Sequence, residues 1–193
     1  MAKNKAKLIN ETKARTGEVQ CSYPHLLTPY AAEEDQKAKY SMCLLIPKTE
    51  ADTIDVITKA IENAKKKGLE TQSWKPAVLQ NPKFHEPLRD GDADKPDKPE
   101  FAGMYFVNAK SDKKPLVIDG AKNKIEDPDE VYAGCWVSAS ITFYPFDVKG
   151  NKGIACALNG VMKLRDDEPI AGGASANDWE AEEDSEDEDD FLN

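Results

Sequence analysis

The residues best suited to chemistry lie between 131 and 146, where side chains alternate between two faces. One face is apolar and predicts a strand that lines a core; it comprises Val131, Ala133, Cys135, Val137, Ala139, Ile141 and Phe143. The other places aromatic rings among small and hydroxyl residues: Tyr132, Gly134, Trp136, Ser138, Ser140, Thr142 and Tyr144. Exposed rings stack on nucleic-acid bases at about 1–3 kcal/mol per base. The pattern predicts that Tyr132, Trp136 and Tyr144 stack bases. The alternative is that Trp136 and Tyr144 are buried in a second small core, beneath a loop formed by residues 75–100.

Basic residues flank this stretch and are suited to neutralise phosphates. Two lie in the next turn and two end the following strand: Lys149, Lys152, Lys163 and Arg165. Phe106 and Lys110 share one face of another predicted strand, and Arg89 lies in a loop with aromatic neighbours. Single-strand binders combine cations that follow the phosphates with rings that take the bases. Any one lysine taken alone is more often a solvated surface charge, so the prediction depends on the grouping.

Catalytic and metal-binding patterns are weak in this sequence. The two histidines, His25 and His85, have no metal-ligand spacing to a cysteine. The acidic residues of 89–94 lack the length and distal Glu of a calcium loop, and 150–153 is too short for a phosphate-binding loop. We therefore expect a binding protein, not an enzyme, with no metal and no cofactor.

The surrounding elements are mostly strands. Alternation and turn residues predict strands over 16–23, 37–46, 103–110, 116–118, 131–146 and 154–164, with a hairpin turn over 147–153. A helical period predicts one helix over about 50–67, ended by Gly68. Residues 75–100 are rich in proline and charge, which favours a long loop. This mainly β order, with one inserted helix, fits a small β-barrel better than a sandwich.

Charge divides the chain into two parts. Residues 1–165 hold all 26 Lys and Arg and 23 of the 36 Asp and Glu, whereas the last 28 residues hold 13 acidic and no basic residues. Such a dense run of like charge predicts a disordered tail. We expect a domain over 1–165 and a flexible acidic tail over 166–193. A tethered polyanion can occupy a cationic groove on the domain, and nucleic acid can displace it.

Other features bound the cellular setting. No run of 18 apolar residues exists, and the basic N-terminus has no apolar segment behind it, so we expect neither membrane association nor a secretory signal. The four cysteines are widely spaced, without a C-x-x-C pair. They indicate reduced, mostly buried thiols in a cytosolic protein more than a disulfide or zinc framework.

Several segments in order resemble a family of phage single-stranded DNA-binding proteins. The segments are Pro87-Leu88-Arg89-Asp90-Gly91-Asp92, Asn108-Ala109-Lys110-Ser111, Tyr132-Ala133-Gly134-Cys135-Trp136-Val137, Gly150-Asn151-Lys152-Gly153-Ile154-Ala155-Cys156 and Lys163-Leu164-Arg165-Asp166-Asp167-Glu168-Pro169. The resemblance covers roughly residues 8–193. It implies an OB-fold, the small barrel that commonly binds oligonucleotides. It also implies phage DNA replication or recombination in the cytoplasm of the bacterial host.

The resemblance further implies that the tail recruits replication proteins such as a polymerase, helicase or recombinase. The tail residues expected to bind them are Asp189, Asp190, Phe191 and Leu192; two residues follow the aromatic Phe191. Exchange of tails between subunits would give a homodimer. Two alternatives remain open at this point. One is an RNA-binding protein of similar fold, and the other is an interaction protein whose tail imitates DNA.

Overall fold

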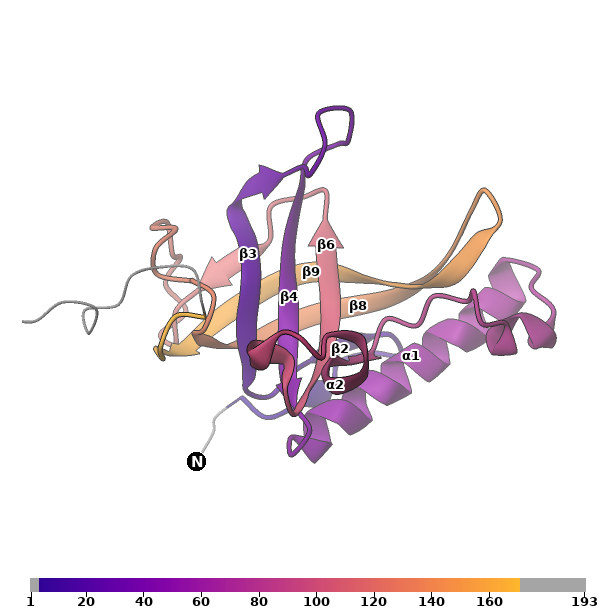
Figure 1. The fold of residues 1–193 in the computed structure, drawn as a ribbon, viewed down its shortest axis with the longest axis horizontal. Coiled ribbons are helices and arrows are strands. Elements are labelled where there is room, and N and C mark those ends of the chain that lie inside the picture. The colour runs from indigo at the N-terminus through magenta and orange to yellow at the C-terminus, as the bar shows by residue number, and fades with distance from the viewer. Residues whose placement is uncertain (1–3, 171–193) are drawn as a thin grey trace, which may run out of the picture.

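The centre of the molecule is a barrel of five strands. The computed structural model describes residues 4–170. The barrel strands are β3 (Val19–Tyr30), β4 (Lys39–Pro47), β6 (Met104–Ser111), β8 (Trp136–Val148) and β9 (Asn151–Arg165). Strands β3, β4 and β6 stand side by side, and β8 and β9 cross behind them (Figure 1). The mainly β, OB-like barrel predicted from the sequence is confirmed.

The ring of strands closes unevenly. The neighbours are antiparallel, except that β6 and β9 are parallel and share the single register pair Lys110–Ala157. Four short strands extend the sheet or pair at its edges: β1 (Lys7–Leu8), β2 (Lys13–Arg15), β5 (Arg89–Asp90) and β7 (Leu116–Ile118). The junction between β6 and β9 is therefore the most sparsely paired of the barrel, followed by that between β3 and β8 with two register pairs.

Strand β8 follows the predicted alternation but differs at both ends. It begins at Trp136, so 131–135 precede it as turn and loop, and it continues past Pro145 to Val148. Proline is tolerated there because β9 is the only strand paired with β8 at that point, which leaves the other edge free. The predicted apolar face does form the core, with Val137, Ala139 and Ile141 fully buried.

The hairpin between β8 and β9 turns on two residues. Lys149 and Gly150 have φ angles of 51° and 83°. Positive φ at both central positions is the type I′ turn, whose twist matches that of the flanking strands. The turn is therefore shorter than the predicted 147–153, and the hairpin extends as a long arm beyond the barrel (Figure 1).

Helix α1 (Ala51–Thr71) packs under the barrel against β8 (Figure 1). Its existence was predicted, but the expectation that Gly68 ends it was wrong, because the helix runs through Gly68. A Cβ at that position would lie 2.3 Å from Cζ3 of Trp74 and 3.1 Å from Cβ of Pro145. Gly68 therefore admits the Trp74 ring against the helix.

The 75–100 segment is irregular, as predicted, yet it contains short elements. These are η1 (Pro76–Gln80), β5, α2 (Gly91–Asp94) and η2 (Pro99–Phe101). It covers two apolar groups: Trp74 and Phe84 join the main core, while Phe101 and Phe106 form a second small core with Cys43 and Leu45. None of the helices in residues 4–170 has the length and hydropathy of a membrane span.

Candidate nucleic-acid interface

A groove of about 910 Å³ lies across the barrel strands β3, β4, β6, β8 and β9. Six aromatic rings line it: Tyr23, His25, Tyr30, His85, Tyr144 and Phe146. Lys39 and Lys110 line it as well, beside Ser41 and Asn108. Rings and cations thus share one concave surface, which is the combination that single-strand binding requires.

The strand pleat explains how β6 and β8 contribute. Successive side chains of a strand point to opposite faces, so Asn108 and Lys110 are exposed while Val107 and Ala109 are buried. On β8, Tyr144 follows the buried Phe143 and keeps 46% of its surface exposed. Burial of the rest raises the pKa of Tyr144, with further contributions from Cys156 and Asp112, so the phenol stays neutral near pH 7.

Tyr23 reaches the groove through an irregularity in β3. Its φ angle is 46°, and the pairing with β4 shifts between Ser22 and His25. The left-handed conformation turns the ring outward, and 52% of Tyr23 is exposed. Lys98 Nζ donates to the Tyr23 hydroxyl at 2.9 Å and lies 5.3 Å from the ring centroid. The hydrogen bond to Tyr23 raises the pKa of Lys98.

The two histidines belong to this groove. The His25 ring stacks on Tyr30 with centroids 4.5 Å apart, and His85 lies 5.9 Å from Phe146. The His85 amide donates to the Lys152 carbonyl at 3.0 Å, which holds the loop beside β9. Burial lowers the pKa of His85, and Arg89 lowers it further, so the ring is neutral at pH 7 and suited to stacking.

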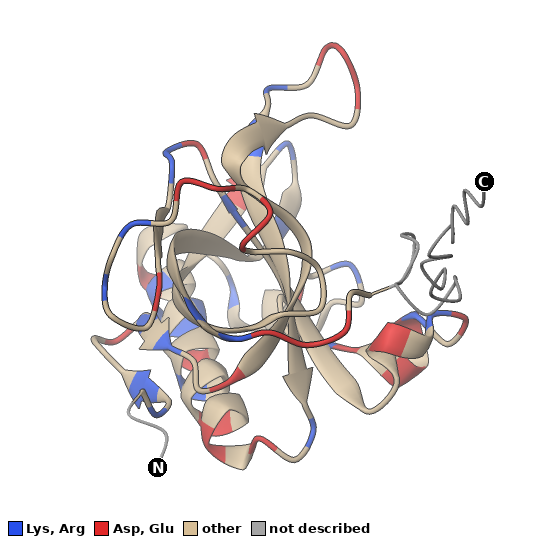
Figure 2. Ribbon diagram, turned by 90° about the vertical axis from the view of Figure 1, so that its left-hand side faces the viewer, with Lys and Arg blue, Asp and Glu red and all other residues tan. Residues whose placement is uncertain are grey.

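A second hollow of about 470 Å³ adjoins the groove and shares Tyr30, Lys39 and Lys110 with it. It adds Lys37, whose Nζ lies 3.5 Å from Asp112. Residues of the loop joining β3 and β4 line this hollow. The loop carries acidic residues at its tip (Figure 2). Lys37 and Lys39 both lie within ion-pair distance of Asp112 Oδ1, at 3.5 and 3.8 Å, so a phosphate would compete with that carboxylate for them.

The predicted residues divide between this groove and other places. Tyr144 and Lys110 line the groove, and Lys149 lies in the turn that follows β8. Lys152 lies 4.0 Å from the Asp147 carboxylate. Arg89 Nε donates to Asp94 at 2.6 Å.

Phe106 faces the same side of β6 as Lys110, but Phe101 covers it. Only 4% of Phe106 is exposed, and the two rings meet edge to face with centroids 5.1 Å apart. The structure therefore places Phe106 in the second small core, out of reach of a base.

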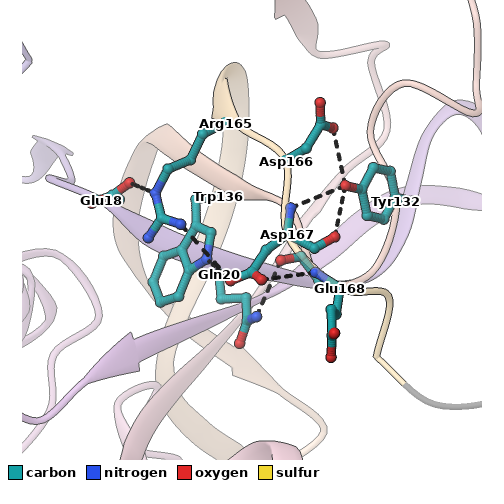
Figure 3. Close-up of polar contacts among 9 residues, drawn as sticks. Glu18, Gln20, Tyr132, Trp136, Arg165, Asp166, Asp167 and Glu168 are labelled. Atoms are coloured by element: carbon teal, nitrogen blue, oxygen red, sulfur yellow. Dashed lines mark hydrogen bonds and ion pairs between the residues drawn. The ribbon is translucent and has the colours of Figure 1, made fainter.

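The remaining four predicted residues, Tyr132, Trp136, Lys163 and Arg165, gather at the other end of β8. Figure 3 shows Tyr132, Trp136 and Arg165 there. They do not line the groove. The segment 166–168 lies over the two rings and bonds to both. The alternative of Trp136 and Tyr144 in a core under the 75–100 loop does not occur, since Tyr144 is exposed and Trp136 contacts the 166–168 segment.

Five groove rings escaped prediction: Tyr23, His25, Tyr30, His85 and Phe146. Alternation predicts the strand only as far as Tyr23. The pairing of β3 with β4 shifts register there, so alternation does not tell which face the later residues of β3 occupy. Phe146 follows Pro145, a residue type that disfavours a central strand. The histidines were considered only as metal ligands.

The acidic residues of the 89–94 loop face a lysine. Lys48 Nζ lies 2.8 Å from both Asp90 Oδ1 and Asp92 Oδ2. These hydrogen bonds lower the pKa of both carboxyls.

Within residues 4–170 no group of three or more His, Cys, Asp or Glu is arranged to hold a metal ion. All four cysteines are buried and unbridged. The predicted tail residues Asp189, Asp190, Phe191 and Leu192 lie outside the described residues.

Comparison with known proteins agrees with this architecture. The protein p50 of Acyrthosiphon pisum secondary endosymbiont phage 1 is 31% identical over 168 residues, covering 85% of this chain and 89% of p50. The single-stranded DNA-binding protein from bacteriophage Enc34, solved in complex with ssDNA, superposes with a TM-score of 0.71 and 34% identity, over 86% of this chain and 93% of that chain.

A more distant structure has the same fold. It is gp2.5, a single-stranded DNA-binding protein encoded by bacteriophage T7, with a TM-score of 0.59 and 17% identity over 93% of this chain and 97% of that one. The family match is more extensive, since residues 12–192 match the family described as "Enterobacter phage Enc34, ssDNA-binding protein". The chain belongs to this family of phage single-stranded DNA-binding proteins.

Proposed function

We propose that the protein binds single-stranded DNA without sequence preference and without catalysis, in phage DNA replication or recombination. The observation that supports this most is the groove, where six exposed or half-buried rings accompany Lys39 and Lys110. Every base has a face that can stack on a ring, so such a surface tolerates any sequence. The relative from phage Enc34 was solved with ssDNA bound.

The arrangement suggests separate roles for the rings and the lysines. Tyr144 and Tyr30 expose 46% and 55% of their surfaces, enough for a base to stack on either ring. Lys39 and Lys110, on the adjacent strands β4 and β6, would pair with phosphates. Lys149 and Lys152, on the hairpin arm, would extend the phosphate contacts as the DNA leaves the groove.

Fluorescence anisotropy with a labelled oligo-dT over a range of salt concentrations tests this proposal. Each phosphate contact on single strands contributes about 0.7 to the slope of log K against log salt. The variant K39Q/K110Q should lower that slope by about 1.4, whereas K59Q/K66Q, on exposed positions of α1, should leave it unchanged. An unchanged slope in K39Q/K110Q would place the DNA elsewhere, and no binding by the wild type would refute the function.

The same titration distinguishes the two alternatives. Oligo-rU should bind more weakly than oligo-dU of equal length if the protein serves DNA, and more tightly if it serves RNA, because these two oligomers differ only in the 2′-hydroxyl group. A protein that acts solely through a DNA-mimicking tail would bind neither oligomer.

We further infer that the acidic tail competes for the groove and recruits replication or recombination proteins when DNA displaces it. Substituting the five consecutive acidic residues 186–190 by Gln or Asn in the full chain should tighten DNA binding, most at low salt where charges are least screened. The variant F191A/L192A should bind DNA normally and lose partner capture in a pull-down with the host polymerase, helicase or recombinase. Normal capture by that variant would exclude the apolar tip from the partner site.

A further inference from the structure

The segment that follows β9 crosses the end of the barrel as a strap, which we define as residues 166–170. Its backbone joins the body where the Ile170 amide donates to the Ala133 carbonyl at 2.9 Å. A Cβ on Gly134 would lie 2.3 Å from the Glu168 carbonyl oxygen, so the glycine lets the strap approach closely. Ile170 then packs against the second small core. The strap thus has a defined place on the barrel.

Two strap carboxylates are held by one ring donor and one cation each; Figure 3 shows both ring donors and Arg165. Trp136 Nε1 donates to Asp167 Oδ2 at 2.8 Å, and Arg165 lies 3.8 Å from the same oxygen. The Tyr132 hydroxyl lies 3.0 Å from Asp166 Oδ1, and Lys163 Nζ lies 2.7 Å from it. Hydrogen bonds from Lys163 to Asp166 and from Trp136 to Asp167 lower the pKa of both carboxyls, so both are ionised at pH 7.

The cations also lie against the rings. The Arg165 guanidinium is 4.7 Å from the Trp136 ring centroid, and Lys163 Nζ is 5.6 Å from that of Tyr132. Arg165 is fixed from its other side by the Glu18 carboxylate. The four residues Tyr132, Trp136, Lys163 and Arg165 therefore form a preassembled patch whose N–H and O–H donors and positive charges converge on two anions.

We propose that this patch is a second phosphate-binding site for single-stranded nucleic acid, which the carboxylates of Asp166 and Asp167 occupy until a strand displaces them. Lys, Arg, Tyr and Trp donors bind phosphate oxygens by the same charge-assisted hydrogen bonds that they make to carboxylates. Once the strap lifts, the two rings would be free to stack bases.

The patch is separate from the groove. Tyr144 lies eight positions after Trp136 on β8, which at 3.3 Å per residue is about 26 Å along the strand. A strand that fills the groove therefore leaves the patch covered unless it is long enough to reach it. The inference rests on the proposed function for its ligand class, but it concerns different residues and a different end of the barrel.

The test compares full-length variants that all keep residues 171–193, so that the distal tail cannot account for a difference. In D166N/D167N the strap loses its two anions while keeping its shape. Binding of an oligo-dT of about 30 nucleotides should tighten roughly tenfold at 0.05 M salt, and the salt slope should steepen by about 1.4, since two more phosphates are engaged. Adding K163Q and R165Q to that variant should return the slope to its wild-type value.

A charge-matched control is E62Q/E70Q, which removes two exposed carboxylates from α1 and should leave the slope unchanged. Steepening in both variants would reflect net charge alone and would overturn the proposal. So would an unchanged slope in D166N/D167N with a lowered unfolding temperature, which would make the strap a purely structural latch. If the wild type binds oligo-dT normally in that case, the proposed function stands; if it does not bind at all, both fail.

Discussion

His25 and Tyr30 stack nearly parallel at the mouth of the groove, with 11° between their ring planes. The pair presents the outer face of Tyr30, 55% exposed, as a platform already supported from behind. Tyr30→Ala should weaken oligo-dT binding by about 5- to 150-fold, because one stacked base contributes about 1–3 kcal/mol. Tyr30→Phe keeps the ring and should bind as the wild type does; anisotropy titration measures both. Equal weakening in the two variants would assign the role to the hydroxyl group.

Substitution of Lys149 in the hairpin turn can remove its charge without disturbing the fold. Asn-Gly is the favoured pair for a type I′ turn, so Lys149→Asn should leave the unfolding temperature unchanged or slightly raised. If Lys149 pairs with a phosphate, the same variant should lower the salt slope of DNA binding by about 0.7. Calorimetry and anisotropy over a salt range check the two outcomes. A slope equal to that of the wild type would place Lys149 away from the DNA.

Gly68 should resist substitution although it lies inside a helix. Alanine normally favours a helix interior by about 1 kcal/mol over glycine. Here the added Cβ would meet the Trp74 ring at 2.3 Å, and forced repacking typically costs about 1–3 kcal/mol. We expect Gly68→Ala to lower the free energy of unfolding in urea denaturation. Gly120→Ala, where no atom lies within 4 Å of the new Cβ, is the control and should be nearly neutral.

The ion pairs of Lys48 with Asp90 and Asp92 predict how the stability of the protein changes in acid. Because the folded-state pKa values of Asp90 and Asp92 are lowered, the stabilisation is present above their unfolded pKa of about 3.9 and is lost as the pH falls through the folded values. Lys48→Met should therefore lower the unfolding temperature at pH 7, and its curve should approach that of the wild type as the pH falls below the lowered pKa values of Asp90 and Asp92. Lys59→Met on α1 should follow the wild type throughout. Parallel curves for Lys48→Met and the wild type would contradict the linkage.

The sequence predicted what depends on local periodicity. The core face of β8 was readable because Val137, Ala139 and Ile141 alternate with polar residues without interruption. The helix was predictable from the spacing of Ile54, Ile57 and Ile61, but its C-terminal end was not. Gly68 lies inside the helix because the Trp74 ring packs against it, and the periodicity of the helix does not reveal that contact.

The candidate site was predictable only in part, for a related reason. Tyr144 and Lys110 were found because regular strands carry them. Tyr23 and Tyr30 were missed because the irregular pairing of β3 changes which side faces the groove. The position of Trp136 beneath the strap depends on a contact with Asp167, 31 residues along the chain, which alternation in β8 cannot disclose.

The closure of the barrel between β6 and β9 has a mechanical consequence. Asn108, Ala109 and Lys110 on one side of this junction and Ala155 and Cys156 on the other all line the groove. Only one register pair joins the two strands, fewer than at any other junction of the barrel, so the groove lies across its most sparsely paired junction. A polymer bound across this junction would contact both strands and hold them together. The protein with bound polymer should therefore have a higher unfolding temperature than the free protein.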